Sequence, residues 1–392
     1  MNTWLLPENF DRAVFLRDYW QKKPLLIRGA GHFVDPISPD ELAGLACEDC
    51  VESRLVQSDV TRAHWRLRHG PFTEQDFDGL PETHWSLLVQ AVDQWHDGVR
   101  QMLQEFDFIP RWRIDDIMIS FASDGGGVGP HFDYYDVFLI QGQGRKRWQL
   151  GGRVDSHSPL LPDTDLRLLR DFQAEEDWIV EPGDILYLPP NLAHYGVAIG
   201  DSVTYSIGFR TPSVAEILED FTSTLVQDLP ADVRYVDTAP HAPEHPGVLQ
   251  ADAITQIQAL LSTQLLDKQR IAHWFGRYMT SPKYPELSVA SAEPLSCNAL
   301  AAFLKDGEVL LRNPAARLAF CELADGAELY ADGHLLPCSP ALTPLLPQLC
   351  DPFTEPGDWL DAVLVCPQGL QLITDLYNLG SLYLADDEDC GD

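Results

Sequence analysis

The sequence predicts a mainly β domain with added α-helical elements, followed by a helical segment and a smaller mixed α/β domain. Between residues 114 and 209 short apolar segments alternate with glycine- and proline-containing turns, which is typical of a β-sandwich or β-barrel. After residue 212 apolar residues recur at helical spacing, and the last part of the chain alternates helix, strand and hairpin signals. We therefore expect domains at 1–211, 212–280 and 281–392.

The composition is that of a folded protein with more than one domain. The chain has 392 residues, 45% of them hydrophobic, with ten tryptophans, which excludes intrinsic disorder. It contains no run of about eighteen apolar residues that could cross a membrane. The first residues, MNTWLLPENFDRAVF, lack the basic start and apolar core of a signal peptide. We therefore expect a soluble, cytoplasmic protein.

The chain is strongly acidic. It has 27 basic and 60 acidic side chains, which give a formal net charge of −33. Nucleic-acid binding depends on Lys and Arg that neutralise phosphates, so no nucleic-acid partner is expected. Complementary fields accelerate association, so a basic protein is the favoured partner.

The region before the barrel should contain both helices and strands. Residues 9–21 form an amphipathic helical pattern, and residues 24–28 read as a strand. Alternating patterns predict strands over 51–57 and 63–68. Apolar residues at helical spacing predict a long helix over 82–106.

Eight cysteines are scattered along the chain, and two of them, Cys47 and Cys50, have a spacing that suits a metal or redox site. They follow a capping-box sequence that begins at Ser38, which places them at the end of a helix. No second pair accompanies them. Ordinary helix-end cysteines are therefore favoured over a zinc or redox role.

Two segments carry candidate metal ligands. In GGGVGPHFDYYD (residues 125–136), His131 and Asp133 are two residues apart, so on a strand their side chains share one face. In EPGDILYLPPNLAHYGV (181–197), an apolar strand turns at a proline pair and presents His194. Two histidines and one carboxylate form the facial triad of non-haem Fe(II) oxygenases. The alternatives are a barrel corner with incidental polar residues and a phosphate loop, which is rejected because the glycines lead into a strand.

Several longer segments resemble the JmjC-type cupin oxygenases, and in particular the bacterial ribosomal oxygenases. They are PLLIRGA (24–30), DPISPDELAGLA (35–46), THWSLLVQAV (83–92), WRIDDIMISF (112–121), GGGVGPHFDYYDVFLIQGQGRKRW (125–148) and EPGDILYLPP (181–190). The resemblance covers most of the first 215 residues. It implies that the β domain is a double-stranded β-helix, the cupin barrel.

The resemblance also implies an activity. Fe(II) held by His131, Asp133 and His194 would work with 2-oxoglutarate and O2 to hydroxylate the Cβ of an arginine in a large-subunit ribosomal protein, number sixteen in this family. Two alternatives stay open: a cupin enzyme that acts on a small molecule, and a protein demethylase or histidyl hydroxylase of the same superfamily.

The remote carboxylate of 2-oxoglutarate needs a buried cation, with a hydroxyl beside it. Three neighbouring residues, Arg145, Lys146 and Arg147, follow a glycine turn of unknown parity, so strand alternation does not choose between them. The resemblance selects Lys146 as the cation and suggests Ser120 as the hydroxyl.

An arginine substrate needs carboxylates and aromatic faces near the mouth of the barrel. Asp136, Tyr134 and Tyr135 are the candidates, because they lie close to the proposed ligands in the sequence. Asp115 and Asp116 are more speculative acids of the same kind.

The rear part of the chain should provide assembly rather than catalysis. Helices are expected over 213–229 and 251–279, and the resemblance implies that this helical region forms a homodimer. Hairpin turns at Asp325-Gly326 and Asp332-Gly333 indicate a winged-helix-like module. Its low content of Lys and Arg argues against DNA binding. The acidic tail 386–389 is interpreted as a solvated end.

Overall fold

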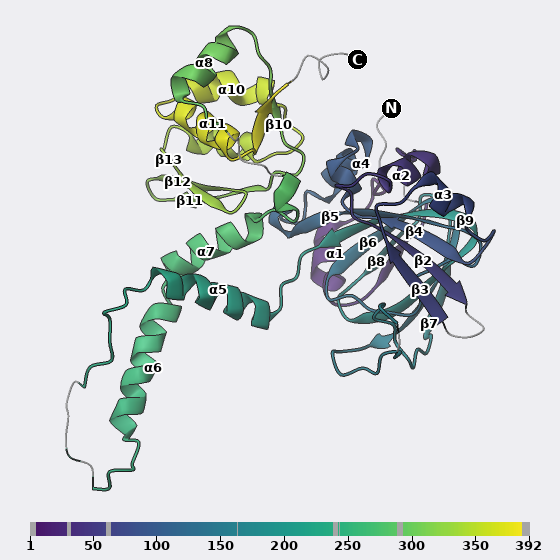
Figure 1. Cartoon of the computed structure of the whole chain (residues 1–392), viewed down its shortest axis with the longest axis horizontal. Helices are drawn as coiled ribbons and strands as arrows, with labels where there is room; N and C mark the ends of the chain where they lie inside the picture. The colour runs from purple at the N-terminus through teal and green to yellow at the C-terminus, as the bar shows by residue number, and fades with distance from the viewer. Residues whose placement is uncertain are drawn as a thin grey trace. The chain divides into compact units, whose positions relative to one another are not determined.

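The computed structural model describes residues 5–29, 33–59, 64–162, 164–237, 242, 244–287 and 293–385. The chain divides into two compact units, Met1–Thr211 and Pro212–Asp392 (Figure 1). The further boundary expected near residue 280 stays a prediction, and the acidic tail 386–389 lies outside the described residues. None of the described helices is long and apolar enough to cross a membrane.

The first unit is built on one antiparallel sheet of nine strands, in the order β1-β8-β6-β9-β5-β4-β2-β3, with β7 paired to β6. Strands β6 and β9 have 18 residues each and pair along most of their length, so they link the two halves of a barrel-like, strongly curved sheet (Figure 1). The β domain expected from the sequence is confirmed. The strands are β1 (Leu25–Ile27), β2 (Ser53–Asp59), β3 (His64–His69), β4 (Trp85–Val89), β5 (Ile114–Ala122), β6 (Asp136–Arg153), β7 (Glu176–Val180), β8 (Ile185–Leu188) and β9 (Leu192–Phe209).

Alternate residues of the long strands enter two different cores. One set, which includes Val137, Leu139 and Leu150, packs inside the barrel. The other set includes Phe138, whose ring lies 5.3 Å from that of Phe15 and 4.8 Å from that of Phe106. Both faces of the sheet are therefore covered. The helices of this unit are α1 (Arg12–Asp18), α2 (Pro39–Leu45), α3 (Glu74–Asp78), η2 (Val92–Gln94), α4 (Asp97–Gln101), η3 (Met102–Phe106) and η4 (Arg111–Arg113).

The long helix predicted over 82–106 is wrong. Residues Trp85–Val89 form β4, which pairs with both β2 and β5, and helix begins only later in the segment. Four consecutive residues of β4 are buried, and a strand covered on both faces has the same short apolar run as a buried helix. Ala91, at a left-handed φ of 52°, then turns the chain into η2.

A bulge interrupts β6 at residues 142–144. The pairing with β9 shifts on both sides of Gln143. Gly144 has a φ of +64°, and a Cβ at this position would lie 1.9 Å from the backbone oxygen of Asp201. Only glycine fits here. The bulge determines which of the three basic residues faces the barrel interior, a question that the sequence left open. Lys146 is buried, whereas Arg145 and Arg147 are exposed.

The second unit begins with helices and continues as a small mixed domain (Figure 1). The helix expected over 251–279 is two helices, because the Asp267 side chain accepts hydrogen bonds from the backbone N–H groups of Gln269 and Arg270 and starts a new helix. The Trp274 indole donates to Asp220 at 2.6 Å and ties the third helix to the first. These helices are α5 (Val214–Asp228), α6 (Ala251–Leu265) and α7 (Lys268–Thr280).

The remainder of the second unit is a three-stranded meander beside a helical core. One hairpin turns at Asp332-Gly333 as expected, and the other turns at Ala324-Asp325, one residue earlier than predicted. Trp359 and Leu329 are fully buried in the shared core. The elements are η5 (Pro285–Leu287), α8 (Cys297–Lys305), β10 (Leu310–Arg312), β11 (Leu318–Leu323), β12 (Gly326–Ala331), β13 (His334–Cys338), η6 (Thr343–Leu345), α9 (Leu346–Leu349), α10 (Pro356–Leu364), α11 (Gly369–Asn378) and β14 (Leu382–Leu384).

The bulge makes a prediction about stability. Gly144→Ala should lower the free energy of unfolding by about 2–4 kcal/mol, because the new Cβ meets a backbone carbonyl. Gly200→Ala is the matched control: its φ is +70°, but nothing lies within 4 Å of the added Cβ, so the cost should be only about 1 kcal/mol. Urea unfolding followed by tryptophan fluorescence measures both. Equal losses would show that the close contact does not matter.

Candidate metal centre

The two histidines are brought together by their own backbones. The N–H of His131 donates to the carbonyl oxygen of His194 at 2.9 Å, and the N–H of His194 donates to that of His131 at 2.8 Å. Directly paired residues project their side chains from the same face. The carbonyl of Asp133 accepts from the N–H of Asn191 at 2.7 Å, which holds the carboxylate residue against the start of β9.

The protonation of both imidazoles follows from their neighbours. Nδ1 of His131 lies 2.9 Å from the carbonyl oxygen of Gly129, and Nδ1 of His194 lies 2.9 Å from that of Leu192. A carbonyl only accepts, so Nδ1 of each ring is the donor, and in the neutral form of either ring Nε2 is the atom that keeps a lone pair. Burial, with His131 nearby, lowers the pKa of His194 to about 4. The His194 ring is therefore neutral at neutral pH.

Both free ring nitrogens face the same carboxylate. Oδ2 of Asp133 lies 3.9 Å from Nε2 of His131 and 3.6 Å from Nε2 of His194. One ligand atom from each of the three residues lies within 4.8 Å of the others, and this is the group of possible metal ligands found in the described part of the chain. His194 is buried, whereas the other two side chains are partly exposed. The set can hold one metal ion and leave one side open.

A buried cation lies in the same barrel. Lys146 is 5% exposed, and its ammonium group donates to the hydroxyl of Thr204 at 3.3 Å. Ser120 is paired directly with Thr204 across β5 and β9, so the two hydroxyls share one face. The Trp148 ring lies 5.1 Å from the Lys146 nitrogen and 5.9 Å from the His194 ring. The Trp148 ring therefore lies near both the Lys146 ammonium and one of the candidate metal ligands.

The two residues that flank Lys146 in the sequence do not point into the barrel. Arg147 is exposed and forms an ion pair with Asp177. Arg145 is also exposed. Their side chains leave the opposite face of β6, as strand alternation requires once the bulge is known.

The three predicted substrate residues differ in position. Tyr134 and Tyr135 are each 42% exposed. The Arg167 guanidinium lies 5.5 Å from the centre of the Tyr134 ring. The charge of Asp133, followed by burial of the hydroxyl, raises the pKa of Tyr135. The Tyr135 hydroxyl therefore faces the metal ligands.

Asp136 does not line the metal side of the barrel, which corrects the expectation that it could contact a substrate. It is 0% exposed, and its carboxylate accepts from the Tyr187 hydroxyl at 2.6 Å, from Gln21 at 3.1 Å and from Arg113 at 3.2 Å. It is paired with Phe209, which belongs to the aromatic core on the outer face. Asp136 joins β6 to the N-terminal segment and has no free oxygen to offer.

Other acids and cysteines also have structural positions. Asp116 accepts from the Gln90 side chain at 2.7 Å and from the Ala91 N–H at 3.0 Å. Cys47 follows α2, and its thiol donates to the Ala43 carbonyl in the manner of a helix-end cysteine. Gln141, Thr204 and Trp148 were missed as site residues, since only the strand register places them beside Lys146.

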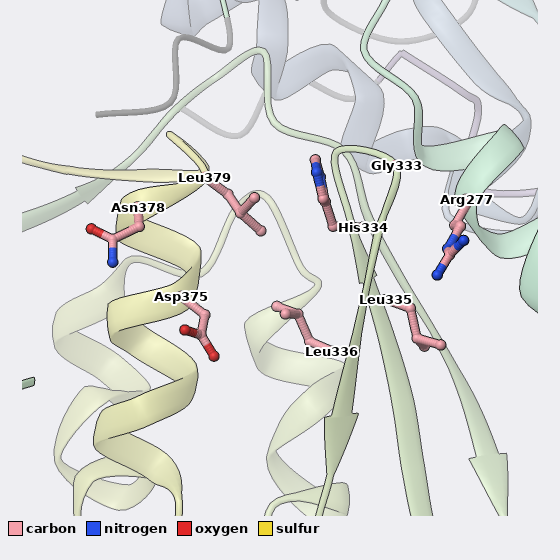
Figure 2. Close-up of a pocket in the computed structure, with 8 residues that line it drawn as sticks. All are labelled: Arg277, Gly333, His334, Leu335, Leu336, Asp375, Asn378 and Leu379. Carbon is pink, nitrogen blue, oxygen red and sulfur yellow. The ribbon is translucent and has the colours of Figure 1, made fainter. Parts of the chain in front are cut away.

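A separate hollow of about 490 Å³ lies in the second unit (Figure 2). Arg277, His334 and Asp375 lie around it, together with two leucines of β13 and Leu379, which follows α11. It contains none of the candidate metal ligands. We therefore assign the chemistry to the barrel.

The ligand assignment predicts metal affinity. Asp133→Asn should weaken the binding of Co(II) by roughly 100-fold or more, because losing a ligand costs more than losing an outer hydrogen bond to one. Asp177→Asn is the matched control, since that carboxylate pairs with Arg147 on the outside of the barrel. Isothermal titration calorimetry measures the affinity. Wild-type affinity in Asp133→Asn would remove that residue from the ligand set.

Comparison with protein families agrees with this architecture. A model described as "JmjC domain" matches residues 101–217, and one described as "ROXA-like winged helix" matches residues 259–383. A third, "AraC-like ligand binding domain", matches residues 172–274 and overlaps both. The fold class expected from the sequence, a cupin-type barrel followed by helices and a winged-helix domain, is confirmed.

Known proteins resemble most of the chain. "Ribosomal protein uL16 3-hydroxylase" of Escherichia coli is 38% identical over 370 residues, which cover 93% of this chain and 95% of that protein. "Probable ribosomal oxygenase" of Haemophilus influenzae is 44% identical over 216 residues, 55% of this chain and 53% of that protein. A solved structure of YcfD, described as an Escherichia coli ribosomal oxygenase in complex with cobalt and 2-oxoglutarate, matches with a TM-score of 0.82 at 34% identity, and the match covers 97% of this chain and 99% of that one. The chain belongs to the ribosomal oxygenase family of JmjC-domain enzymes.

Proposed function

We propose that this protein is an Fe(II)- and 2-oxoglutarate-dependent oxygenase that hydroxylates an arginine side chain of ribosomal protein uL16. The observation that carries the proposal is the combination, in one barrel, of a facial set of metal ligands and a buried lysine without a carboxylate partner among the described residues. The name of the Escherichia coli relative supports the ribosomal protein as substrate and position 3 as the site of hydroxylation. Action on a ribosomal protein would support a cytoplasmic location.

His131, Asp133 and His194 would hold the iron. Their donor set, two imidazoles and one carboxylate, suits Fe(II) and leaves coordination positions open for the co-substrate and O2. The bound iron would supply activation of O2 coupled to oxidation of the 2-oxo acid. The backbone carbonyls of Gly129 and Leu192 keep both Nε2 atoms available to the metal.

Lys146 and Ser120 would bind the remote carboxylate of 2-oxoglutarate. Burial lowers the pKa of Lys146 to about 8, because the surroundings provide no anion to offset the lost hydration. A bound carboxylate would restore that balance, and the Ser120 hydroxyl would donate a second hydrogen bond to it. The Trp148 indole N–H, buried without a hydrogen-bond partner among the residues that the structure describes, is a further polar group near Lys146.

Tyr135 and Tyr134 would contact the substrate. Their partly exposed rings offer aromatic faces to a guanidinium group close to the metal ligands. The net charge of −33 would favour approach of a basic ribosomal protein. Asp136 is excluded from this role by its buried hydrogen bonds.

Activity provides the direct test of the proposal. With Fe(II), 2-oxoglutarate and O2, the wild type should add one oxygen atom to an arginine of uL16 and release succinate, as read by peptide mass spectrometry. His131→Ala should lower the rate by about two orders of magnitude or more, since it removes a metal ligand. His157→Ala, an exposed histidine in a loop, is the control. Hydroxylation of a histidine, or turnover in His131→Ala, would contradict the proposal.

We also propose that the enzyme is a homodimer formed through its helical region. On α6, Ile254, Ile257 and Leu261 lie on one helical face and are 44 to 60% exposed. A stripe of this kind on an unpaired helix needs a partner to be covered.

The dimer proposal predicts the effect of one charge on this stripe. Leu261→Asp should shift the mass of the particle in solution toward that of one chain, because a carboxylate would be buried in the interface. Ala259→Asp places the same charge on the far face of α6 and should leave the dimer intact. Size-exclusion chromatography with light scattering distinguishes them. Equal masses for wild type and Leu261→Asp would argue against this interface.

A further inference from the structure

A short chain of hydrogen bonds orients the Lys146 ammonium. In the described part of the protein, its hydrogen-bond partner is the hydroxyl of Thr204, 3.3 Å away. The Thr204 hydroxyl in turn lies 3.3 Å from Oε1 of Gln141. The side-chain nitrogen of Gln141 donates to the backbone carbonyl of Gln143 at 2.7 Å. Thr204 and Gln141 are both 1% exposed, so water does not compete with these contacts.

The direction of this chain is fixed by chemistry. The Gln143 carbonyl can only accept, so the Gln141 amide must point its NH₂ group there and its oxygen toward Thr204. The single hydroxyl proton of Thr204 is then donated to Gln141, and its lone pair accepts from Lys146. An ammonium has three N–H bonds. Two of them are left for a ligand.

The bulge in β6 supplies the starting point of the chain. The register of the pairing with β9 shifts on both sides of Gln143. The carbonyl of this residue accepts a hydrogen bond from the side chain of Gln141 on the same strand. Gly144, which permits the bulge, is thereby linked to the orientation of Lys146 two residues later.

We propose that Thr204 and Gln141 are positioning residues that hold the Lys146 ammonium toward the remote carboxylate of the dicarboxylate co-substrate. The inference rests on the proposed function, because it assumes that a 2-oxo dicarboxylic acid binds at the metal. According to this proposal, affinity for the remote carboxylate depends on a series of hydrogen bonds that we call the relay. It runs from the Gln143 carbonyl through the side chains of Gln141 and Thr204 to the Lys146 ammonium. Without the Thr204 acceptor, the ammonium would keep its contact with the Trp148 ring, whose centre is 5.1 Å away, and would no longer be held toward the co-substrate.

The test compares two ligands on two variants of the full-length protein loaded with Mn(II). Both 2-oxoglutarate and oxalate chelate a metal through adjacent oxygens, but oxalate has no remote carboxylate. Thr204→Val keeps the shape and removes the hydroxyl. It should weaken 2-oxoglutarate binding by about 10- to 100-fold, the value of a hydrogen bond to a charged group, and leave oxalate binding unchanged. Calorimetry gives both dissociation constants.

Kinetics and the conservative variant provide a second readout. In Thr204→Val the KM for 2-oxoglutarate should rise while kcat stays within about threefold, since the relay acts on binding and not on the reacting atoms. Thr204→Ser retains the hydroxyl and should return the affinity to within about threefold of wild type. Gln141→Met removes the acceptor for the Thr204 proton without shortening the side chain. It provides the same ligand comparison if Thr204→Val does not fold.

Four results would separate the possible failures. Unchanged 2-oxoglutarate affinity in Thr204→Val would overturn the relay, and so would equal weakening of 2-oxoglutarate and oxalate, which indicates a general distortion of the barrel. If Lys146→Ala loses affinity for 2-oxoglutarate and Thr204→Val does not, the proposed function stands and only the relay is refuted. A wild type that binds Mn(II) but not 2-oxoglutarate would refute the proposed co-substrate itself.

Discussion

The candidate metal centre depends on one backbone contact. His131, in the loop before β6, and His194, at the start of β9, exchange two hydrogen bonds of 2.9 and 2.8 Å. This pairing sends both imidazoles to one side, and the neighbouring carbonyls then fix which ring nitrogen is free. Because the contact joins residues 63 positions apart in the sequence, the ligand set exists only when the barrel has formed. Folding and metal binding are therefore coupled.

The same barrel also fixes the distance between the candidate metal ligands and the buried cation, Lys146. Two of the candidate metal ligands, His131 and Asp133, are partly exposed, whereas Lys146 is buried, and burial lowers its pKa to about 8. Trp148 lies beside both, with its ring 5.1 Å from the lysine nitrogen and 5.9 Å from the His194 ring. A dicarboxylate that reaches from one end to the other would be fixed at two points before O2 reacts. Such positioning is a large part of what a protein adds to a reactive cofactor.

Much of the site was accessible from the sequence, because metal ligation imposes local spacing. His131 and Asp133 share a strand-like segment, and the second segment carries His194 after a recognisable turn. The choice of Lys146 required either family resemblance or the bulge, since one extra residue reverses the face. Asp136 was misjudged because nearness in sequence says nothing about which face a residue takes. The prediction of a helix over 82–106 was wrong for a related reason. A strand buried on both faces is a continuous apolar run, so its sequence shows no alternation that would distinguish it from a buried helix.

The measurement that tests the account most directly is a crystal structure of the protein with Mn(II) and 2-oxoglutarate. The account predicts one ion bound by Nε2 of His131, Nε2 of His194 and a carboxylate oxygen of Asp133. It also predicts the far carboxylate of the co-substrate within hydrogen-bond distance of the Lys146 ammonium. An ion held by other side chains, or a far carboxylate directed away from Lys146, would contradict it.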